Sequence, residues 1–164
     1  MGTMTTPGGS MTPAEAARAI LAKQWDGTIP VDPVKISKSL GVSVFAAPSL
    51  GVSGDFRELE GKPVIRINST EPVKRQRFTA AHELGHYVLK HGANFRDPTQ
   101  NFSLDYFVPE EVEANRFAAE LLMPSDAVRY VFENEKFSGL TGIADKFNVS
   151  HIAMKLKLIE LGYL

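Results

Sequence analysis

The sequence contains no cysteine, and this absence removes several kinds of chemistry at once. A chain without cysteine has no disulfide framework, no thiolate metal site and no cysteine nucleophile. Any catalytic metal must therefore be held by histidine or carboxylate side chains. The absence also fits a reducing compartment, and we predict a cytoplasmic protein.

Long apolar runs and an excess of charge of one sign are also missing. No stretch approaches the roughly 18 apolar residues of a membrane-spanning helix. The first residues, MGTMTTPGGSM, lack the basic and apolar segments of a secretory signal. We therefore predict a soluble protein with no membrane partner. The formal net charge of −1 gives no general attraction to nucleic acid or to anionic lipid.

What the sequence does contain is typical of one soluble domain with a real core. Of its 164 residues, 43% are hydrophobic and 23% are charged. Gly, Thr and Pro near the N-terminus predict a flexible tail over residues 1–11. We predict a main domain over residues 12–125 and a helical extension over residues 126–164 that packs on it.

Helix signals and strand signals occur in separate blocks, which indicates an α+β fold. Capping residues mark helix starts, and short runs of β-branched residues mark strands. The predicted elements are helices over about 12–26, 32–40, 69–91 and 109–123, strands over about 42–45, 54–57 and 64–67, and two or three short helices within 126–164.

Residues 80–91, AAHELGHYVLKH, place His82, Glu83 and His86 in the spacing H-E-x-x-H inside a predicted helix. Residues four apart lie on one helix face, so both histidines can direct a nitrogen at one point about 2.0–2.1 Å away. Glu83 lies about 100° round the helix, where it can act as a general base for metal-bound water.

Two structural histidines on an amphipathic helix are the alternative to a metal site. Gly85 favours the metal site, because a glycine inside a helix costs about 1 kcal/mol relative to alanine. Its compensation is expected to be close packing, or the approach of a ligand, beside the two histidines.

A catalytic zinc usually has three protein ligands and one open position, so a third ligand is needed. His91 lies about 140° round the helix from His86, and we predict that it interacts with the helix C-terminus instead. The helix that begins near residue 109 offers carboxylates, and helical angles alone do not choose among them. The candidates are Glu110, Glu111, Glu113 and Glu120.

The block AAHELGHYVLKH, followed by EVEANRFAAELLMP, closely resembles the ImmA/IrrE family of bacterial and phage metallopeptidases. The resemblance covers roughly residues 13–124. It implies a zincin-like fold, in which a small antiparallel sheet packs on the active-site helix. It also implies zinc held by His82, His86 and Glu113, with Glu83 as the catalytic base. A site of two histidines and one glutamate also accepts manganese.

The resemblance further implies a function. Members of this family are site-specific zinc endopeptidases whose usual substrate is a helix-turn-helix repressor or an antitoxin-like partner, often encoded next to the peptidase. Cleavage releases stress, phage or mobile-element genes. No residue of this sequence names the substrate. A protein that binds such a partner without cleaving it is the alternative.

Substrate-binding features are less specific. Residues 63–68 directly precede the active-site helix and are a candidate edge strand, to which a peptide could add by backbone hydrogen bonds. An interior strand is an equally good interpretation, because edge position cannot be read from sequence. Tyr87, Tyr106 and Arg116 are candidates for stabilising an oxyanion, and none of them is assigned.

Residues 140–161 are compatible with a helix-turn-helix, which gives a third interpretation, a DNA-associated regulator. Ile152, Leu156 and Ile159 are predicted to form the inner face of its second helix, with Lys155 and Lys157 exposed. That helix has no arginine, asparagine or glutamine suited to reading bases, and the basic bias is faint. We therefore favour a helical pair that completes the core over direct DNA binding.

Overall fold

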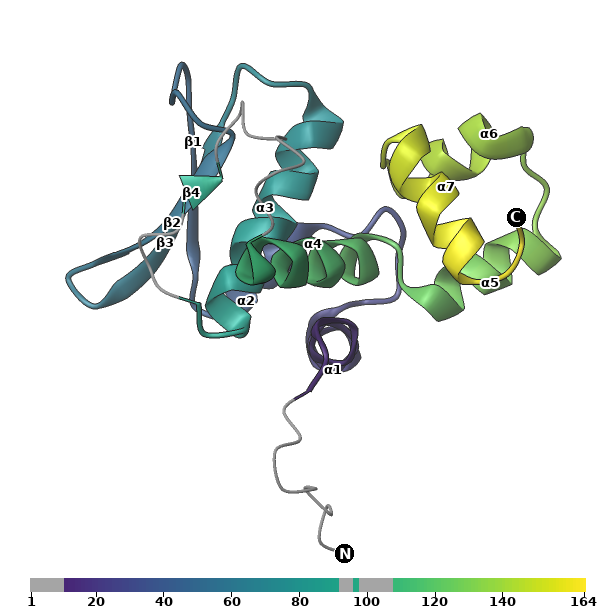
Figure 1. The fold of residues 1–164 in the computed structure, drawn as a ribbon, viewed down its shortest axis with the longest axis horizontal. Coiled ribbons are helices and arrows are strands. Elements are labelled where there is room, and N and C mark those ends of the chain that lie inside the picture. The colour runs from purple at the N-terminus through teal and green to yellow at the C-terminus, as the bar shows by residue number, and fades with distance from the viewer. Residues whose placement is uncertain (1–10, 92–95, 98–107) are drawn as a thin grey trace, which may run out of the picture.

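The computed structural model describes residues 11–91, 96–97 and 108–164 (Figure 1). The α+β class predicted from the sequence is confirmed. Residues 1–10, most of the predicted tail, lie outside the described residues. The elements are α1 (Pro13–Gln24), α2 (Pro33–Ser39), β1 (Ser43–Ala47), β2 (Gly54–Leu59), β3 (Lys62–Asn68), α3 (Val73–Val88), β4 (Arg96–Asp97), α4 (Pro109–Leu122), α5 (Ser125–Asn134), α6 (Gly139–Phe147) and α7 (His151–Glu160).

The first two helices begin where local capping chemistry predicts. The hydroxyl of Thr12 accepts a hydrogen bond from the backbone of Glu15, whose carboxylate accepts one from the backbone of Thr12. Asp32 caps α2 by accepting from two backbone N–H groups. Each cap satisfies N–H groups that have no partner inside the helix, which fixes the starting residue.

The sheet has the strand order β1-β3-β2-β4 and is mixed, whereas the sequence led us to expect an antiparallel sheet. β2 and β3 form an antiparallel hairpin around Glu60 and Gly61, which both have positive φ. β1, however, pairs with β3 in parallel. The chain leaving β1 crosses the position of β3 to form β2, and then returns through the hairpin to form β3. β1 and β3 therefore run in the same direction.

β3 is an interior strand, so residues 63–68 do not form the edge proposed as one of two interpretations of the sequence. Its backbone is hydrogen-bonded to β1 on one side and to β2 on the other. Both rows of backbone groups are therefore occupied, and no peptide can add to this strand without displacing a neighbour. The interior interpretation is the correct one.

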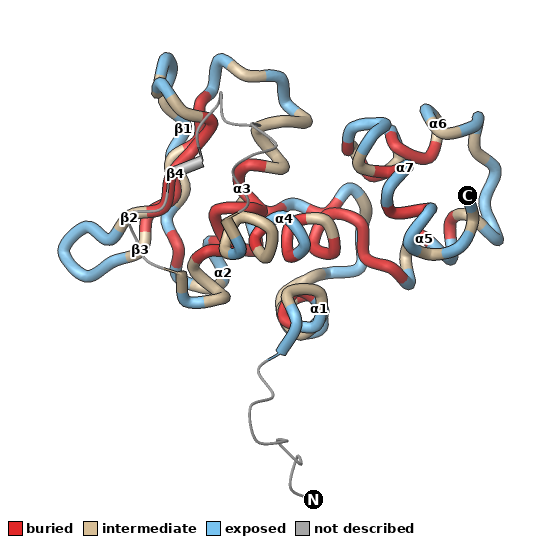
Figure 2. The backbone as a smooth tube through the Cα atoms, in the orientation of Figure 1, coloured by how far each residue is buried: buried red, intermediate tan, exposed pale blue. Residues whose placement is uncertain are grey.

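α3 lies at the centre of the molecule (Figure 1). It packs against β2 and β3 on one side and against α4 on the other, while α1 packs on α4. Figure 2 shows the buried backbone concentrated where α3 and α4 meet. Large side chains such as Leu84, Phe117 and Leu121 are fully buried in this core. The central position of α3 fixes its polar residues in a dry environment.

The three helices α5, α6 and α7 form the end of the molecule away from the sheet (Figure 1). The predicted inner face of α7 is wrong, because Ile152, Leu156 and Ile159 are 74%, 62% and 47% exposed. Met154 and Leu158 are buried instead. Apolar residues occur on both sides of this helix, so the sequence pattern leaves its rotation undetermined.

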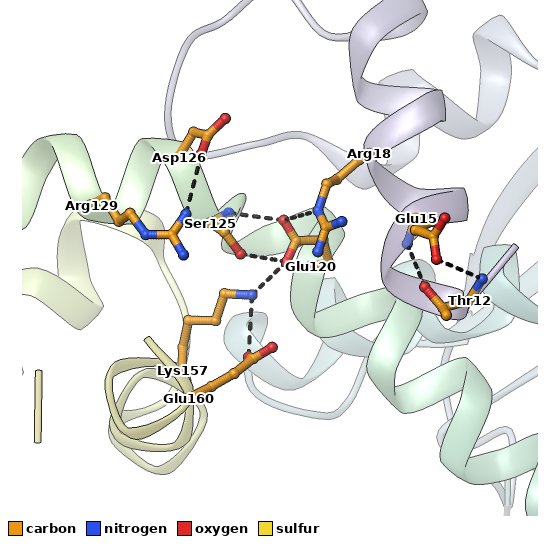
Figure 3. Close-up of polar contacts among 9 residues, drawn as sticks. All are labelled: Thr12, Glu15, Arg18, Glu120, Ser125, Asp126, Arg129, Lys157 and Glu160. Carbon is orange, nitrogen blue, oxygen red and sulfur yellow. Dashed lines mark hydrogen bonds and ion pairs between the residues drawn. The ribbon is translucent and has the colours of Figure 1, made fainter. Parts of the chain in front are cut away.

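Lys157 is also buried, where the sequence suggested an exposed lysine. Its ammonium group lies 2.5 Å from Oε1 of Glu120, a residue of α4 (Figure 3). Glu120 also accepts hydrogen bonds from the backbone and hydroxyl of Ser125, and Arg18 of α1 lies 3.6 Å away. One carboxylate thus connects α1, α4, α5 and α7. Because Lys157 is buried against Glu120, its charge does not reach the surface where it could contact DNA phosphates.

A second connection runs from α3 to the C-terminal helices. The guanidinium of Arg77 donates to the backbone carbonyls of Phe147 and Asn148, which end α6, and to that of Val31 before α2. Lys74 forms an ion pair with Asp145 at 2.8 Å. These contacts hold α6 against the start of α3. Among the described residues, no helix has both the length and the hydropathy to cross a bilayer.

The buried pair of Glu120 and Lys157 leads to a prediction for stability. Burial raises the pKa of Glu120, but hydrogen bonds from Lys157 and Ser125 outweigh it and hold the pKa below the ordinary 4.5. The contribution of this ionised carboxylate is therefore present above about pH 4.5 and is lost as the pH falls further. We expect Glu120→Gln to lower the free energy of unfolding by about 3 kcal/mol at pH 7, because it leaves a buried ammonium without its partner.

Urea unfolding of the wild type and of Glu120→Gln at pH 7 and at pH 4 measures the loss of stability and its dependence on pH. Glu160→Gln is the matched control, because Glu160 contacts the same ammonium but is largely exposed. That change should cost less than about 1 kcal/mol. Equal losses in the two variants would contradict the account given for Glu120.

Candidate metal centre

The residues of the H-E-x-x-H motif all lie on α3 and are all buried. His82, Glu83 and His86 have exposed fractions of 1%, 0% and 0%. Buried charged groups are rare unless a partner or a metal compensates them. Their complete burial therefore marks a place where polar chemistry is concentrated inside the core.

The two histidines and one glutamate of α4 converge on a single point. The Nε2 atoms of His82 and His86 lie 3.1 Å apart. Oε2 of Glu111 lies 3.0 Å from Nε2 of His82, and Oε1 lies 3.0 Å from Nε2 of His86. All three ligand atoms fall within 4.8 Å of one another. Two imidazoles and a carboxylate in this arrangement match the ligand set of a catalytic zinc site.

The protonation states of these groups suit a divalent cation. Burial by itself would raise the pKa of Glu111, but its contacts with His82 and His86 outweigh this and lower the pKa to about 2. Burial lowers the pKa of His86, with the nearby His82 acting in the same direction. At neutral pH the site therefore holds a carboxylate and a neutral imidazole, the forms that bind metal.

The back of His82 is held by a second residue of α4. Oδ1 of Asn115 lies 2.7 Å from Nδ1 of His82. When Nδ1 donates its hydrogen to this oxygen, the lone pair of Nε2 faces Glu111. Asn115 follows Glu111 by four residues, so both lie on one face of α4. The i, i+4 spacing of Glu111 and Asn115 is the signal in the sequence that indicates this shared face.

The structure places Glu113 differently from the position implied by the family resemblance. Glu113 is two residues from Glu111, about 200° round the helix, so the two side chains leave α4 in different directions. Oε2 of Glu113 lies 3.1 Å from Nε2 of His91, and its side chain is 46% exposed. The structure thus brings His82 and His86 together with Glu111, and places Glu113 beside His91.

His91 lies close to the site, although helical angles predicted that it would point elsewhere. Its Nδ1 is 2.8 Å from Nδ1 of His86. The prediction extended an ideal helix to residue 91, whereas α3 ends at Val88. Lys90 then takes a positive φ, and the N–H of His91 bonds to the carbonyl of His86. This turn brings the His91 ring back beside His86.

The remaining candidates have different surroundings. Glu83 lies beside the start of β2, because a side chain on Gly54 would sit 3.6 Å from Cγ of Glu83. Tyr87 stacks at a tilt on Phe56, with ring centroids 5.6 Å apart, which indicates a core role. Arg116 is exposed, and Tyr106 lies outside the described residues. No oxyanion donor is assigned among the described residues.

Gly85 lets α4 approach α3 closely enough to form the cluster. A Cβ at this position would lie 3.0 Å from Cδ1 of Phe117 and 3.3 Å from Cα and O of Ala114. Any side chain would therefore press against the backbone of α4. Ala114 lies between Glu111 and Phe117 in α4, so its contact with Gly85 sets the distance between Glu111 and the two histidines of α3.

Comparison with known proteins identifies a family and a phage relative. Residues 37–158 match the model of a peptidase family, M78, described as the IrrE N-terminal-like domain. The chain is also 37% identical over 89 residues to an uncharacterized immunity region protein 2 of Bacillus phage phi105. That alignment covers 53% of this chain and 54% of the phage protein, so the chain spans about half the length of this relative.

The packing at Gly85 gives a prediction that separates close approach from helix propensity. We expect Gly85→Ala to reduce the free energy of unfolding by up to about 2 kcal/mol. The overpacking cost of about 1–3 kcal/mol exceeds the gain of about 1 kcal/mol from a better helix former. Urea unfolding monitored by circular dichroism measures the change.

Gly142→Ala in α6 is the control for this prediction. A Cβ there would meet its nearest atoms at 3.4 Å, which is an ordinary contact. This variant should be as stable as the wild type, or more stable by up to about 1 kcal/mol. A Gly85→Ala protein that gains stability as Gly142→Ala does would contradict the packing argument.

Proposed function

The chain belongs to the IrrE N-terminal-like family of peptidases, as its motifs predicted, and we propose that it is a zinc-dependent protease. One observation carries the proposal: His82, His86 and Glu111, from two separate helices, point their ligand atoms at one buried place. The ligand atoms of these three residues lie only 3.0–3.1 Å from one another. A divalent cation between them would accept a lone pair from each residue.

We propose His82, His86 and Glu111 as the metal ligands. The family resemblance pointed to Glu113 for the third position, but the contacts of Glu111 with both histidines support Glu111. All three donors are nitrogen or oxygen atoms, which zinc accepts and manganese also accepts. A bound zinc would supply an activated water and would polarise the carbonyl of the scissile bond.

In this proposal Glu83 is the general base. It follows His82 directly on α3 and is fully buried, so its carboxylate acts in a dry environment. There it can accept a proton from the attacking water and pass it to the leaving amine. The rigid position of α3 between the sheet and α4 orients this side chain, so that little reorganisation is needed.

The family and the phage relative support a proposal for the substrate class. We propose a protein substrate, a helix-turn-helix repressor or an antitoxin-like partner, whose cleavage relieves repression of phage, mobile-element or stress genes. The similarity to a phage immunity region protein supports a link to such regulation. The exposed side of α7 carries the apolar residues Ile152, Leu156 and Ile159, and Lys157 is buried, which weighs against direct DNA binding by these helices.

Metal content tests the proposed ligand set. We expect the wild-type chain to bind about one zinc, and His82→Ala and Glu111→Ala to lose it, since each removes one of three ligands. Glu110→Ala is the control, a neighbouring glutamate on the same turn of α4. Because the metal would link α3 to α4, a chelator should lower the melting temperature of the wild type and of this control.

Elemental analysis after dialysis against zinc, together with thermal unfolding, gives these results. A wild type that binds no zinc would remove the metalloprotease proposal. Zinc retained by Glu111→Ala would mean that the third ligand lies elsewhere.

Glu83→Gln separates catalysis from partner binding. We expect this variant to keep its zinc and its partner, and to cleave a repressor encoded beside it about 10²- to 10⁴-fold more slowly, because the general base is lost. Mass spectrometry of the repressor fragments measures cleavage, and a pull-down of the repressor with the peptidase measures binding. If the zinc-loaded wild type binds this repressor as tightly as Glu83→Gln does and does not cleave it, the non-cleaving alternative is favoured.

A further inference from the structure

A continuous set of polar contacts runs behind the proposed metal ligand His86. Nδ1 of His86 lies 2.8 Å from Nδ1 of His91, and Nε2 of His91 lies 3.1 Å from Oε2 of Glu113. His86 is fully buried and the His91 side chain is 8% exposed, whereas Glu113 is 46% exposed. The set therefore leads from the centre of the site to the surface of α4.

With both imidazoles neutral and a carboxylate at the far end, the three groups allow one arrangement of hydrogens. Because a carboxylate only accepts, Nε2 of His91 must donate to Glu113. The Nδ1 atom of a neutral His91 then has no hydrogen and accepts one from Nδ1 of His86. His86 is left with its lone pair on Nε2, which faces Glu111 and His82.

The same arrangement occurs behind the other histidine in a simpler form. Nδ1 of His82 contacts Oδ1 of Asn115, again leaving Nε2 toward the site. α4 thus provides an oxygen for the back of each histidine, directly through Asn115 and indirectly through Glu113. The backbone supports the longer connection, since the N–H of His91 bonds to the carbonyl of His86.

We propose that His91 and Glu113 are positioning residues, which fix the tautomer and ring orientation of His86 so that Nε2 is ready to bind metal. The inference rests on the proposed function, because it needs His86 to be a ligand. It gives Glu113 a role distinct from that of Glu111, although the two lie only two residues apart. Mutation of a residue that orients a metal ligand commonly lowers metal affinity about 10- to 100-fold.

The zinc dissociation constant of the full chain, measured by competition with a chromogenic chelator, tests the inference. We expect His91→Leu to weaken zinc binding about 10- to 100-fold, since it removes the acceptor for Nδ1 of His86. His91→Asn places an amide oxygen near the former Nδ1 and should recover most of the affinity. A purely structural role for the ring would not give this recovery.

Glu113→Leu provides an independent measurement at the other end of the set. We expect a fall in zinc affinity of about tenfold, the lower end of the same range, because Nδ1 of His91 is still there to accept from His86, whereas His91 loses the carboxylate to which its Nε2 donates. Glu110→Leu removes another glutamate from the first turns of α4 and should leave the affinity unchanged. The half-exposed position of Glu113 makes its replacement compatible with folding, so this variant decides if His91→Leu does not fold.

The outcomes distinguish the inference from the proposed function. No zinc binding by the wild type would remove both. Zinc binding by the wild type, with unchanged affinity in His91→Leu and Glu113→Leu, would overturn the inference and leave the metal site intact. Loss of zinc in Glu113→Leu as complete as in Glu111→Ala would make Glu113 a ligand, and would overturn its positioning role.

Discussion

The close approach of α4 to α3 is the contact on which the candidate site depends. Neither helix holds a complete ligand set, since α3 carries the two histidines and α4 carries Glu111. Gly85 has no side chain to keep the backbones apart, so α4 can lie against it at Ala114. The separation of the α3 and α4 backbones at this contact places Glu111 beside His82 and His86. A glycine that weakens the helix locally thereby makes the tertiary arrangement possible.

α4 has a second function on its other side. The face with Glu111 and Asn115 contacts the histidines, while Glu120 near its end connects α1, α5 and α7 through Arg18, Ser125 and Lys157 (Figure 3). Each set contains buried ionisable groups, the two histidines in one and Glu120 with Lys157 in the other, and polar partners compensate them. The helix is therefore fixed at both ends by polar contacts and along its middle by apolar packing. A helix held in this way can keep Glu111 in place within the small tolerance that metal coordination allows.

Local features of the fold were predictable from the sequence because their causes are local. The capping box of Thr12 and Glu15, the Asp32 cap and the turn at Gly61 each depend on residues a few positions apart. The spacing of His82 and His86 on one helix face is also local, so their convergence was predictable. Features that depend on contacts between elements were not. The parallel pairing of β1, the interior position of β3 and the rotation of α7 all follow from packing against distant parts of the chain.

The sequence by itself determined the chemistry available to this protein: no thiolate, two histidines one turn apart with a glutamate between them, and a second helix rich in glutamate. Only the tertiary structure decided which glutamate meets the histidines. The depth and rotation of α4 against α3 set that choice, and they bring Glu111 forward while Glu113 turns toward His91. His91 became a neighbour of His86 because α3 ends before it and the chain turns back. Helical periodicity describes one helix at a time, whereas a metal centre built from two helices depends on how they pack.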